Sequence, residues 1–288
     1  MPVPHQSGRV ASGDVSIHFR KLGSPGEARG RAPILIVHGL SYFSYDWLDV
    51  GQALAGEREF VAMDLRGFGD STRSTQKDYS VPSMAQDIVN LLDHLGWKRA
   101  VLVGHSMGGR STTYVAAKHP ARVAGLALID YSPENAPAGA KRVTQIVANT
   151  PDAFASIEQA MEYFGSRDRA RFEAYLRKID GKFILKRDPH FRDQFRKLLE
   201  TGERPKLGVD MWQLIGEVRC PMLSMRGARS DMYAAPTKEK MKAANPRLQI
   251  VEVEAGHNIA GENPQGFLAA LRPFLAALEE KKHAYERH

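Results

Sequence analysis

The chain has 288 residues, of which 43% are hydrophobic and 25% are charged, and its formal net charge is +7. This composition is typical of globular proteins and excludes a disordered, collagen-like or coiled-coil chain. No segment reaches the roughly 18 consecutive apolar residues of a transmembrane helix, and we expect no secretory signal at the first residues. The basic residues occur in short pairs, so we expect no nucleic-acid partner. Cys220 is the only cysteine, which excludes an internal disulfide and indicates a cytoplasmic protein.

The first half of the chain predicts strands that alternate with helices. Residues 15–19 alternate apolar and polar side chains as an edge strand does. Continuously apolar runs at residues 34–37, 101–103 and 126–129 fit strands that are buried on both faces. Between them, residues 84–92 carry apolar side chains at helical spacing. The pattern predicts an α/β fold with a doubly wound, mostly parallel sheet.

The middle of the chain, residues 132–219, differs from the parts on either side. It holds 16 basic and 13 acidic residues, and its apolar residues recur at helical spacing, in stripes such as the one from Phe172 to Ile179. Such stripes are typical of packed cores, and some of their aromatic rings are candidates to line a ligand cavity. We therefore expect an all-helical insertion at residues 132–219, within a core formed by residues 1–131 and 220–288.

The last part of the chain returns to the pattern of the first half. Apolar runs at residues 221–225 and 249–252 predict two further strands, and residues 267–282 predict a final helix. The insertion therefore divides one α/β core into two segments of sequence.

The strongest chemical signal is the segment Gly104-His105-Ser106-Met107-Gly108. It is a G-x-S-x-G pattern that directly follows a predicted strand and opens a predicted helix. In this setting the serine lies on a sharp turn, where side chains at the two glycine positions would collide with neighbouring backbone. The turn exposes Ser106 at the carboxyl ends of the strands, where open α/β sheets bind ligands. We therefore predict that Ser106 is a nucleophile.

A serine nucleophile requires donors that stabilise the oxyanion formed during its attack. The segment His38-Gly39-Leu40 directly follows the apolar run at residues 34–37. The backbone N–H groups of Leu40 and Met107 are the candidates for this oxyanion hole.

A serine hydroxyl is scarcely ionised at neutral pH, so it also requires a base. His257 follows the last predicted strand and precedes the final helix, which puts it at the same sheet edge as Ser106. His257 is therefore the candidate base. For His38 and His105 we expect structural roles, because they lie within the two turns themselves.

With these motifs the sequence resembles the α/β-hydrolase superfamily over nearly the whole chain. The resemblance implies the chain order serine, acid, histidine, and it implies that the insertion is a cap, or lid, over the active site. It also implies a serine hydrolase that cleaves a carboxylic ester of a small, largely apolar substrate, with thioesters, lactones, amides and carbon–carbon bonds as related possibilities. The segments that carry the resemblance are His38-Gly39, residues 64–71, residues 104–108, residues 130–133 and Gly256-His257.

Two aspartates compete for the acid position of the triad. In most of the superfamily the acid follows the strand after the cap, in a G-x-x-D pattern. Here Gly227 puts Ser230 at that position and Asp231 one residue later. In members that resemble haloalkane dehalogenases, the acid follows an earlier strand, where Asp130 lies. We favour Asp130, and Asp231 is the alternative.

The substrate pocket is expected to be mostly apolar. Tyr42 and Phe43 follow the oxyanion loop and Trp212 lies at the end of the insertion, so all three are candidates to line it. The basic residues of the insertion suggest, alternatively, that the substrate carries a carboxylate. The sequence has no metal-ligand spacing and no nucleotide-binding motif, so we expect neither a metal nor a cofactor. A ligand sensor on the same fold, with slow or no turnover, is the alternative function.

Overall fold

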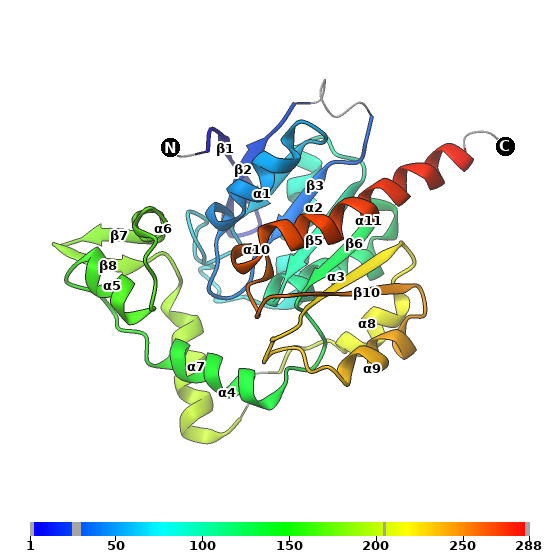
Figure 1. Ribbon diagram of the computed structural model, residues 1–288. Helices are drawn as coiled ribbons and strands as arrows, with labels where there is room; N and C mark the ends of the chain where they lie inside the picture. Colours follow the sequence, from blue (N-terminus) through cyan, green and yellow to red (C-terminus); the bar gives the residue numbers. More distant parts are fainter. Residues whose placement is uncertain (1–2, 25–29, 204–205, 286–288) are drawn as a thin grey trace.

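The computed structural model describes residues 3–24, 30–203 and 206–285. An eight-stranded sheet forms its centre, in the order β1-β2-β4-β3-β5-β6-β9-β10 (Figure 1). Neighbouring strands from β4 to β10 are parallel, whereas β2 is antiparallel to both β1 and β4. The predicted α/β fold with a mostly parallel sheet is therefore confirmed. The strands are β1 (Gln6–Ser12), β2 (Val15–Leu22), β3 (Ile34–Val37), β4 (Phe60–Met63), β5 (Ala100–His105), β6 (Val123–Ile129), β9 (Met222–Gly227) and β10 (Leu248–Val253).

Helices cover both faces of this sheet. Side chains of β3 alternate between two apolar clusters: Leu35 and Val37 join one, and Ile34 and Ile36 join the other. A strand that is buried on both faces has no polar side, which explains the continuously apolar runs of the sequence. Among the described residues, no helix is long and apolar enough to cross a membrane. The first cluster packs under α2 (Val81–His94), α3 (Met107–Lys118), α8 (Met211–Glu217) and α9 (Thr237–Ala244), and the second under α1 (Leu48–Ala55) and α11 (Pro264–Tyr285).

The prediction that residues 15–19 form an edge strand was wrong. They belong to β2, and β1 pairs with β2 along its outer side, with Gln6 opposite Lys21 and Ser12 opposite Val15. A strand at the edge of a sheet is held largely by its backbone, so it needs few apolar side chains. For this reason the polar sequence of β1 carried no strand signal.

Between β6 and β9 the chain leaves the sheet and forms a separate lobe, which Figure 1 shows in green beside the sheet. Residues 137–201 of this lobe are called the inserted segment below. Phe154, Phe172 and Leu176 form a small hydrophobic cluster of their own within it. Its elements are α4 (Pro137–Ala148), α5 (Ile157–Tyr163), α6 (Arg169–Tyr175), β7 (Leu176–Ile179), β8 (Lys182–Leu185) and α7 (Pro189–Thr201).

The prediction of an all-helical insertion was wrong, because the inserted segment also contains two strands. The helix expected to run to Ile179 ends at Tyr175, and β7 and β8 pair as an antiparallel hairpin. Asp180 and Gly181 connect these strands, with φ angles of 48° and 77°. Two consecutive residues with positive φ form the turn that matches the twist of a hairpin, and Asp-Gly favours it. The dipeptide was therefore an available signal for the hairpin.

Helix α8 also differs from expectation. Its residues fall inside the predicted insertion at 132–219, but the helix packs against α3 and α9, which flank the sheet. The part of the chain that leaves the sheet is therefore shorter than the range predicted from composition.

Candidate active site

The parallel strands bring four of the predicted residues to one edge of the sheet. His38 follows β3, Ser106 follows β5, Asp130 follows β6, and His257 lies on the loop after β10. Because these strands run in the same direction, their carboxyl ends meet at a common edge. Residues that are far apart in the sequence therefore become neighbours there.

Ser106 lies on a strained turn between β5 and α3. Its φ of 50° and ψ of −115° are unfavourable for a residue with a side chain, at a cost of about 1–3 kcal/mol. A β-carbon on Gly108 would lie 2.3 Å from the carbonyl oxygen of Val37, and one on Gly104 would lie 2.8 Å from Cα of Gly109. Glycine at both positions therefore allows α3 to pack closely enough to present the serine hydroxyl.

A buried histidine holds the loop that follows β3. The side chain of His38 is fully buried. Its Nδ1 donates to the carbonyl oxygen of Gly39 at 2.7 Å, and its Nε2 accepts from the N–H of Leu65 at 2.9 Å. Burial lowers the pKa of His38, so the ring stays neutral in this arrangement. Its two hydrogen bonds serve the backbone, which orients the loop toward Ser106.

The candidate oxyanion donors lie on two segments that touch. A β-carbon on Gly39 would be only 3.1 Å from Cβ of Ser106, so the loop that carries Leu40 runs directly beside the serine. Met107 is the first residue of α3, and an N–H in the first turn of a helix has no acceptor within that helix. Among the described residues, neither the N–H of Leu40 nor that of Met107 has a backbone acceptor, so both stay candidates for the oxyanion hole.

His257 forms its main side-chain contact with Asp130. The distance from Nδ1 of His257 to Oδ2 of Asp130 is 2.6 Å. The carboxylate is buried, and it also accepts a hydrogen bond from the N–H of Gly227 at 2.8 Å and one from the hydroxyl of Ser230. Asp130 has a φ of 44°, so both it and Ser106 adopt strained conformations at this edge of the sheet.

The segment after β9 explains why Asp231 does not reach the histidine. Ser230 occupies the usual acid position, and its hydroxyl donates to Asp130 while it accepts from the N–H of Met232 at 3.1 Å. The side chain of Asp231 forms a bidentate ion pair with Arg142, at 2.6 and 2.8 Å. The structure therefore brings His257 together with Asp130 and directs Asp231 elsewhere.

His105 is hydrogen-bonded to the backbone of His257. Its Nε2 donates to the backbone carbonyl oxygen of His257 at 3.1 Å, and its ring meets the edge of Tyr42 with 4.7 Å between the centroids. Burial holds the pKa of His105 well below its usual value. A neutral imidazole here adds no charge next to His257.

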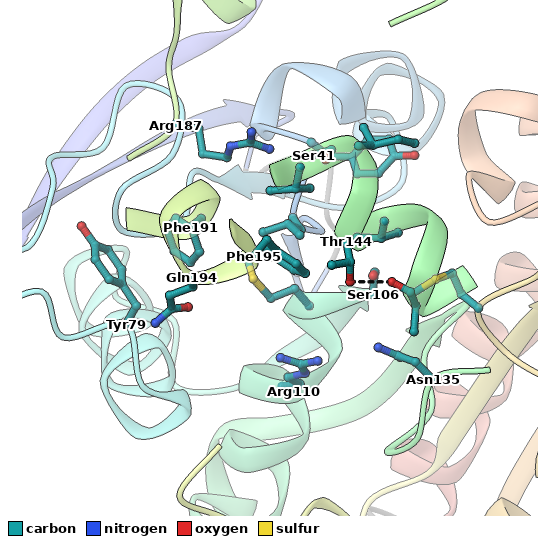
Figure 2. Close-up of a pocket in the computed structure, with 18 of the residues that line it drawn as sticks. Ser41, Tyr79, Ser106, Arg110, Asn135, Thr144, Arg187, Phe191, Gln194 and Phe195 are labelled. Carbon is teal, nitrogen blue, oxygen red and sulfur yellow. Dashed lines mark hydrogen bonds between the residues drawn. The ribbon is translucent and has the colours of Figure 1, made fainter. Parts of the chain in front are cut away.

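A cavity of about 1000 Å³ lies between this edge of the sheet and the inserted segment. Ser106 and His257 line it, and Figure 2 shows Ser106 below Thr144 of α4. The predicted pocket residues Tyr42 and Phe43 line the cavity. Trp212 does not, because α8 packs beside the sheet, where Trp212 lies against the main core. The aromatic residues that line the cavity include Tyr42, Phe43, Phe172, Tyr175, Phe191 and Phe195.

Two basic residues of the cavity were not predicted individually from the sequence. Arg110 and Arg187 line it, and Figure 2 shows them on different sides of the cavity. Arg110 had a signal, because it follows Ser106 by four positions and one helical turn separates such residues. Arg187 was covered only by the general expectation for the basic residues of the insertion, because its place depends on how the inserted segment folds back over the sheet.

A polar link joins the inserted segment to the candidate oxyanion loop. Arg171 of α6 donates from Nε to Asp46 at 2.7 Å, and Tyr175 also donates to this carboxylate. Arg171 reaches the carbonyl oxygen of Ser41 at 3.3 Å as well. Burial raises the pKa of Asp46 to about 6, although the charge of Arg171 opposes the rise. The cationic partner is therefore needed to keep this carboxylate charged.

We expect this link to contribute measurably to stability. A double-mutant cycle with Asp46→Asn and Arg171→Met should give a coupling free energy of about 1–2 kcal/mol, because both side chains are largely buried. Chemical denaturation would measure it. Arg169 and Glu173 on the same helix are both more than half exposed, and water screens their interaction, so their cycle should give a much smaller coupling. Equal coupling in the two cycles would contradict this assessment.

One group of described residues offers three possible ligand atoms for a metal ion: His18, Asp64 and Asp70. Arg20 contacts both carboxylates, at 3.4 and 3.2 Å, and Lys186 pairs with Asp70 at 2.9 Å. Burial opposes ionisation of Asp64, but the hydrogen bond from His18 and the charge of Arg20 still hold its pKa well below the usual range. The cluster therefore already has its counter-charges, and we interpret it as a structural ion-pair network.

Comparison with known proteins agrees with the fold and with hydrolytic chemistry. Residues 32–264 match the family described as alpha/beta hydrolase fold. A fluoroacetate dehalogenase from Burkholderia is 27% identical over 96% of both chains, and the esterase YbfF from Escherichia coli is 28% identical over 85% of this chain and 93% of its own. The crystal structure of E-2-(acetamidomethylene)succinate hydrolase superimposes with a TM-score of 0.82 and 25% identity, covering 95% of this chain and all of that one.

Proposed function

The chain belongs to the α/β-hydrolase fold family, and on that basis we propose that it is a serine hydrolase of carboxylic esters or related acyl bonds. One observation carries the proposal: Ser106 and His257 share a cavity, and the ring of His257 is hydrogen-bonded to Asp130 at 2.6 Å. The residues thus have the roles of nucleophile, base and orienting acid. The relatives, which include an esterase and a hydrolase of an acetamido compound, support the same broad chemistry.

The proposed reaction follows from the positions of these groups. Ser106 Oγ attacks the carbonyl carbon of the substrate while Nε2 of His257 takes its proton. The N–H groups of Leu40 and Met107 stabilise the tetrahedral oxyanion. His257 then protonates the leaving group, and an acyl-enzyme remains on Ser106. Water, deprotonated by His257, attacks this ester and releases the acid. Asp130 keeps the histidine in the required tautomer throughout.

The serine nucleophile argues against the reaction of the dehalogenase relative. Displacement of a halide from an alkyl carbon by a carboxylate forms an ester, which water can cleave at its carbonyl group. The same displacement by Ser106 would form an ether, which has no carbonyl group to attack and would leave the protein inactivated. Acyl transfer, by contrast, returns the serine unchanged after each cycle.

We also propose that the inserted segment acts as the lid of the site. Residues of α4 and α7, among them Thr144 and Phe191, line the cavity opposite Ser106 (Figure 2). A cover of this kind excludes water from the site and strengthens the electrostatic interactions inside it. The link between Arg171 and Asp46 would join the lid to the oxyanion loop.

A fluorophosphonate probe tests the proposed nucleophile directly. We expect one covalent adduct by intact mass, located on Ser106, because the reagent reacts with activated serine hydroxyls. Ser106→Ala should not be labelled. Ser111 lines the same cavity one turn further along α3, and Ser111→Ala should be labelled like the wild type. Turnover of about 1 s⁻¹ or more on a short ester series would separate an enzyme from a ligand sensor. Absence of an adduct, or an adduct elsewhere, would contradict the proposal.

A further inference from the structure

We propose that the substrate carries a carboxylate group, which binds to Arg110 next to the nucleophile and gains a second cationic contact from Arg187 of the inserted segment. The inference rests on the proposed hydrolase function and names its substrate class. It follows from the charges of the cavity wall, where the half-buried Arg110 and the buried Arg187 differ from the other buried arginines among the described residues.

The other buried arginines among the described residues have acidic partners. Arg58 pairs with Glu279 at 2.8 Å, Arg66 with Asp87 at 2.7 Å, and Arg226 with a glutamate at 2.9 Å. Within the described part of the chain, no carboxylate oxygen lies within 4.0 Å of the guanidinium group of Arg110 or of Arg187. A guanidinium removed from water without a counter-charge is costly. Its retention in a cavity beside a nucleophile indicates a role in binding an anion.

Arg110 is placed for contact with the part of a substrate next to its reacting carbonyl. It lies on α3 one helical turn after Ser106, and its side chain lines the cavity (Figure 2). Ser106 is the N-cap of this helix and Arg110 lies in its first turn, so the two residues are close neighbours along the chain and in the fold. Burial lowers the pKa of Arg110, and Tyr131 is the titratable group that opposes the shift. Tyr131 lines the same cavity, and its hydroxyl has no hydrogen-bond partner among the described residues.

Arg187 adds a second positive charge to the cavity wall, on the inserted segment. It lies between β8 and α7 and is only 9% exposed. Its Nη2 donates to the hydroxyl of Thr150 at 3.2 Å, which fixes the group without neutralising it. Burial lowers the pKa of Arg187 to about 10, and the charge of Arg192 acts in the same direction. The guanidinium nevertheless remains protonated at neutral pH.

The carboxylates on the cavity wall do not cancel these charges, because each has a partner of its own. Asp130 contacts His257, Glu134 pairs with Lys240 at 2.8 Å, and Asp78 accepts from the N–H of Ser80 at 3.0 Å. A ligand carboxylate would therefore meet two unpaired cations in a partly dehydrated cavity. In such a cavity a guanidinium forms short, bidentate hydrogen bonds with a carboxylate, and these bonds are stronger than those from neutral donors.

The spacing of Ser106 and Arg110 narrows the substrate class. One helical turn is spanned by the carbon chain of a short dicarboxylic acid, with one carboxyl group esterified at Ser106 and the other free at Arg110. The structure therefore assigns the cavity to half-esters, or half-amides, of short dicarboxylic acids. Hydrolysis would release the free dicarboxylate and an alcohol or amine.

A matched pair of esters tests this inference. We expect the wild type to hydrolyse mono-4-nitrophenyl glutarate with a kcat/KM roughly 10- to 100-fold above that of methyl 4-nitrophenyl glutarate, whose carboxylate is capped. In Arg110→Met this ratio should fall close to one, and Arg110→Lys should restore part of it. Arg187→Met should lower the ratio less. Lys118→Met removes a positive charge from the exposed end of the same helix, and it should leave the ratio unchanged.

Binding without turnover provides a second measurement. Glutarate should raise the melting temperature of the Ser106→Ala protein and should fail to do so for Ser106→Ala/Arg110→Met. Equal ester ratios in the wild type and Arg110→Met, or equal effects of glutarate on the two Ser106→Ala proteins, would overturn the inference and leave the hydrolase proposal standing. If the proposed hydrolase function were wrong, neither ester would be cleaved through Ser106. The glutarate measurement would then still show whether Arg110 binds a carboxylate.

Discussion

Ser106→Ala is expected to lower kcat on a 4-nitrophenyl ester by about 10⁶-fold, and His257→Ala by a similar factor. The serine attacks only when the histidine removes its proton, so either substitution removes the same step. The double variant should consequently be no slower than either single variant. Steady-state hydrolysis, corrected for the spontaneous reaction, measures all three rates.

Some activity above the uncatalysed rate should survive in these variants. The N–H groups of Leu40 and Met107 and the cavity walls are unchanged, and such features alone retain about 10³- to 10⁴-fold acceleration in enzymes of this type. Ser111→Ala is the matched control, since it removes a second hydroxyl from the same cavity wall. Multiplicative losses in the double variant would show that Ser106 and His257 do not act as one unit, and would contradict the proposed triad.

Asp130→Asn is expected to lower kcat by about 10³- to 10⁴-fold. An asparagine amide retains the shape of the side chain but can present an N–H to Nδ1 of His257, which favours the wrong tautomer of the ring. It also removes the negative charge that stabilises the imidazolium formed during the reaction. The substitution keeps the volume of a buried site, so circular dichroism should show an unchanged fold.

Asp231→Asn is the matched comparison for this prediction, because Asp231 is the other aspartate of the region. Its carboxylate pairs with Arg142, and both side chains are more than a third exposed. We expect less than about a tenfold loss of kcat and less than about 1 kcal/mol of stability. A large loss in Asp231→Asn together with a small one in Asp130→Asn would mean that the acid had been chosen wrongly.

The two aspartates show which part of the site could not be derived from local sequence. Asp130 and His257 are separated by 127 positions, and Asp130 was favoured over Asp231 only through the resemblance to haloalkane dehalogenases. The G-x-x-D pattern pointed to the segment after β9, and the structure has Ser230 there, with its hydroxyl bonded to Asp130. The choice between Asp130 and Asp231 depended on which of the two side chains points toward His257. A shift of one residue along an extended chain reverses the direction in which a side chain points.

The wrong predictions for residues 132–219 have a similar origin. A stripe from Phe172 to Ile179 fits a helix by its spacing, but the turn at Asp180 and Gly181 ends the helix and begins a hairpin. Trp212 was placed at the pocket because it precedes the return to the sheet. In the folded chain it lies beside the core, because α8 packs against α3.

Features that depend on neighbouring residues could be predicted from the amino-acid sequence. The buried strands followed from continuous apolar runs, and the sharp turn at Ser106 followed from two glycines that allow close backbone contact. Contacts between distant segments became visible only in the folded chain: the partner of His257, the outer position of β1, and the cavity that Arg110 and Arg187 share. Local sterics act within a few residues and leave a pattern in the sequence. Contacts between loops depend on the packing of the whole chain, and they leave no such pattern.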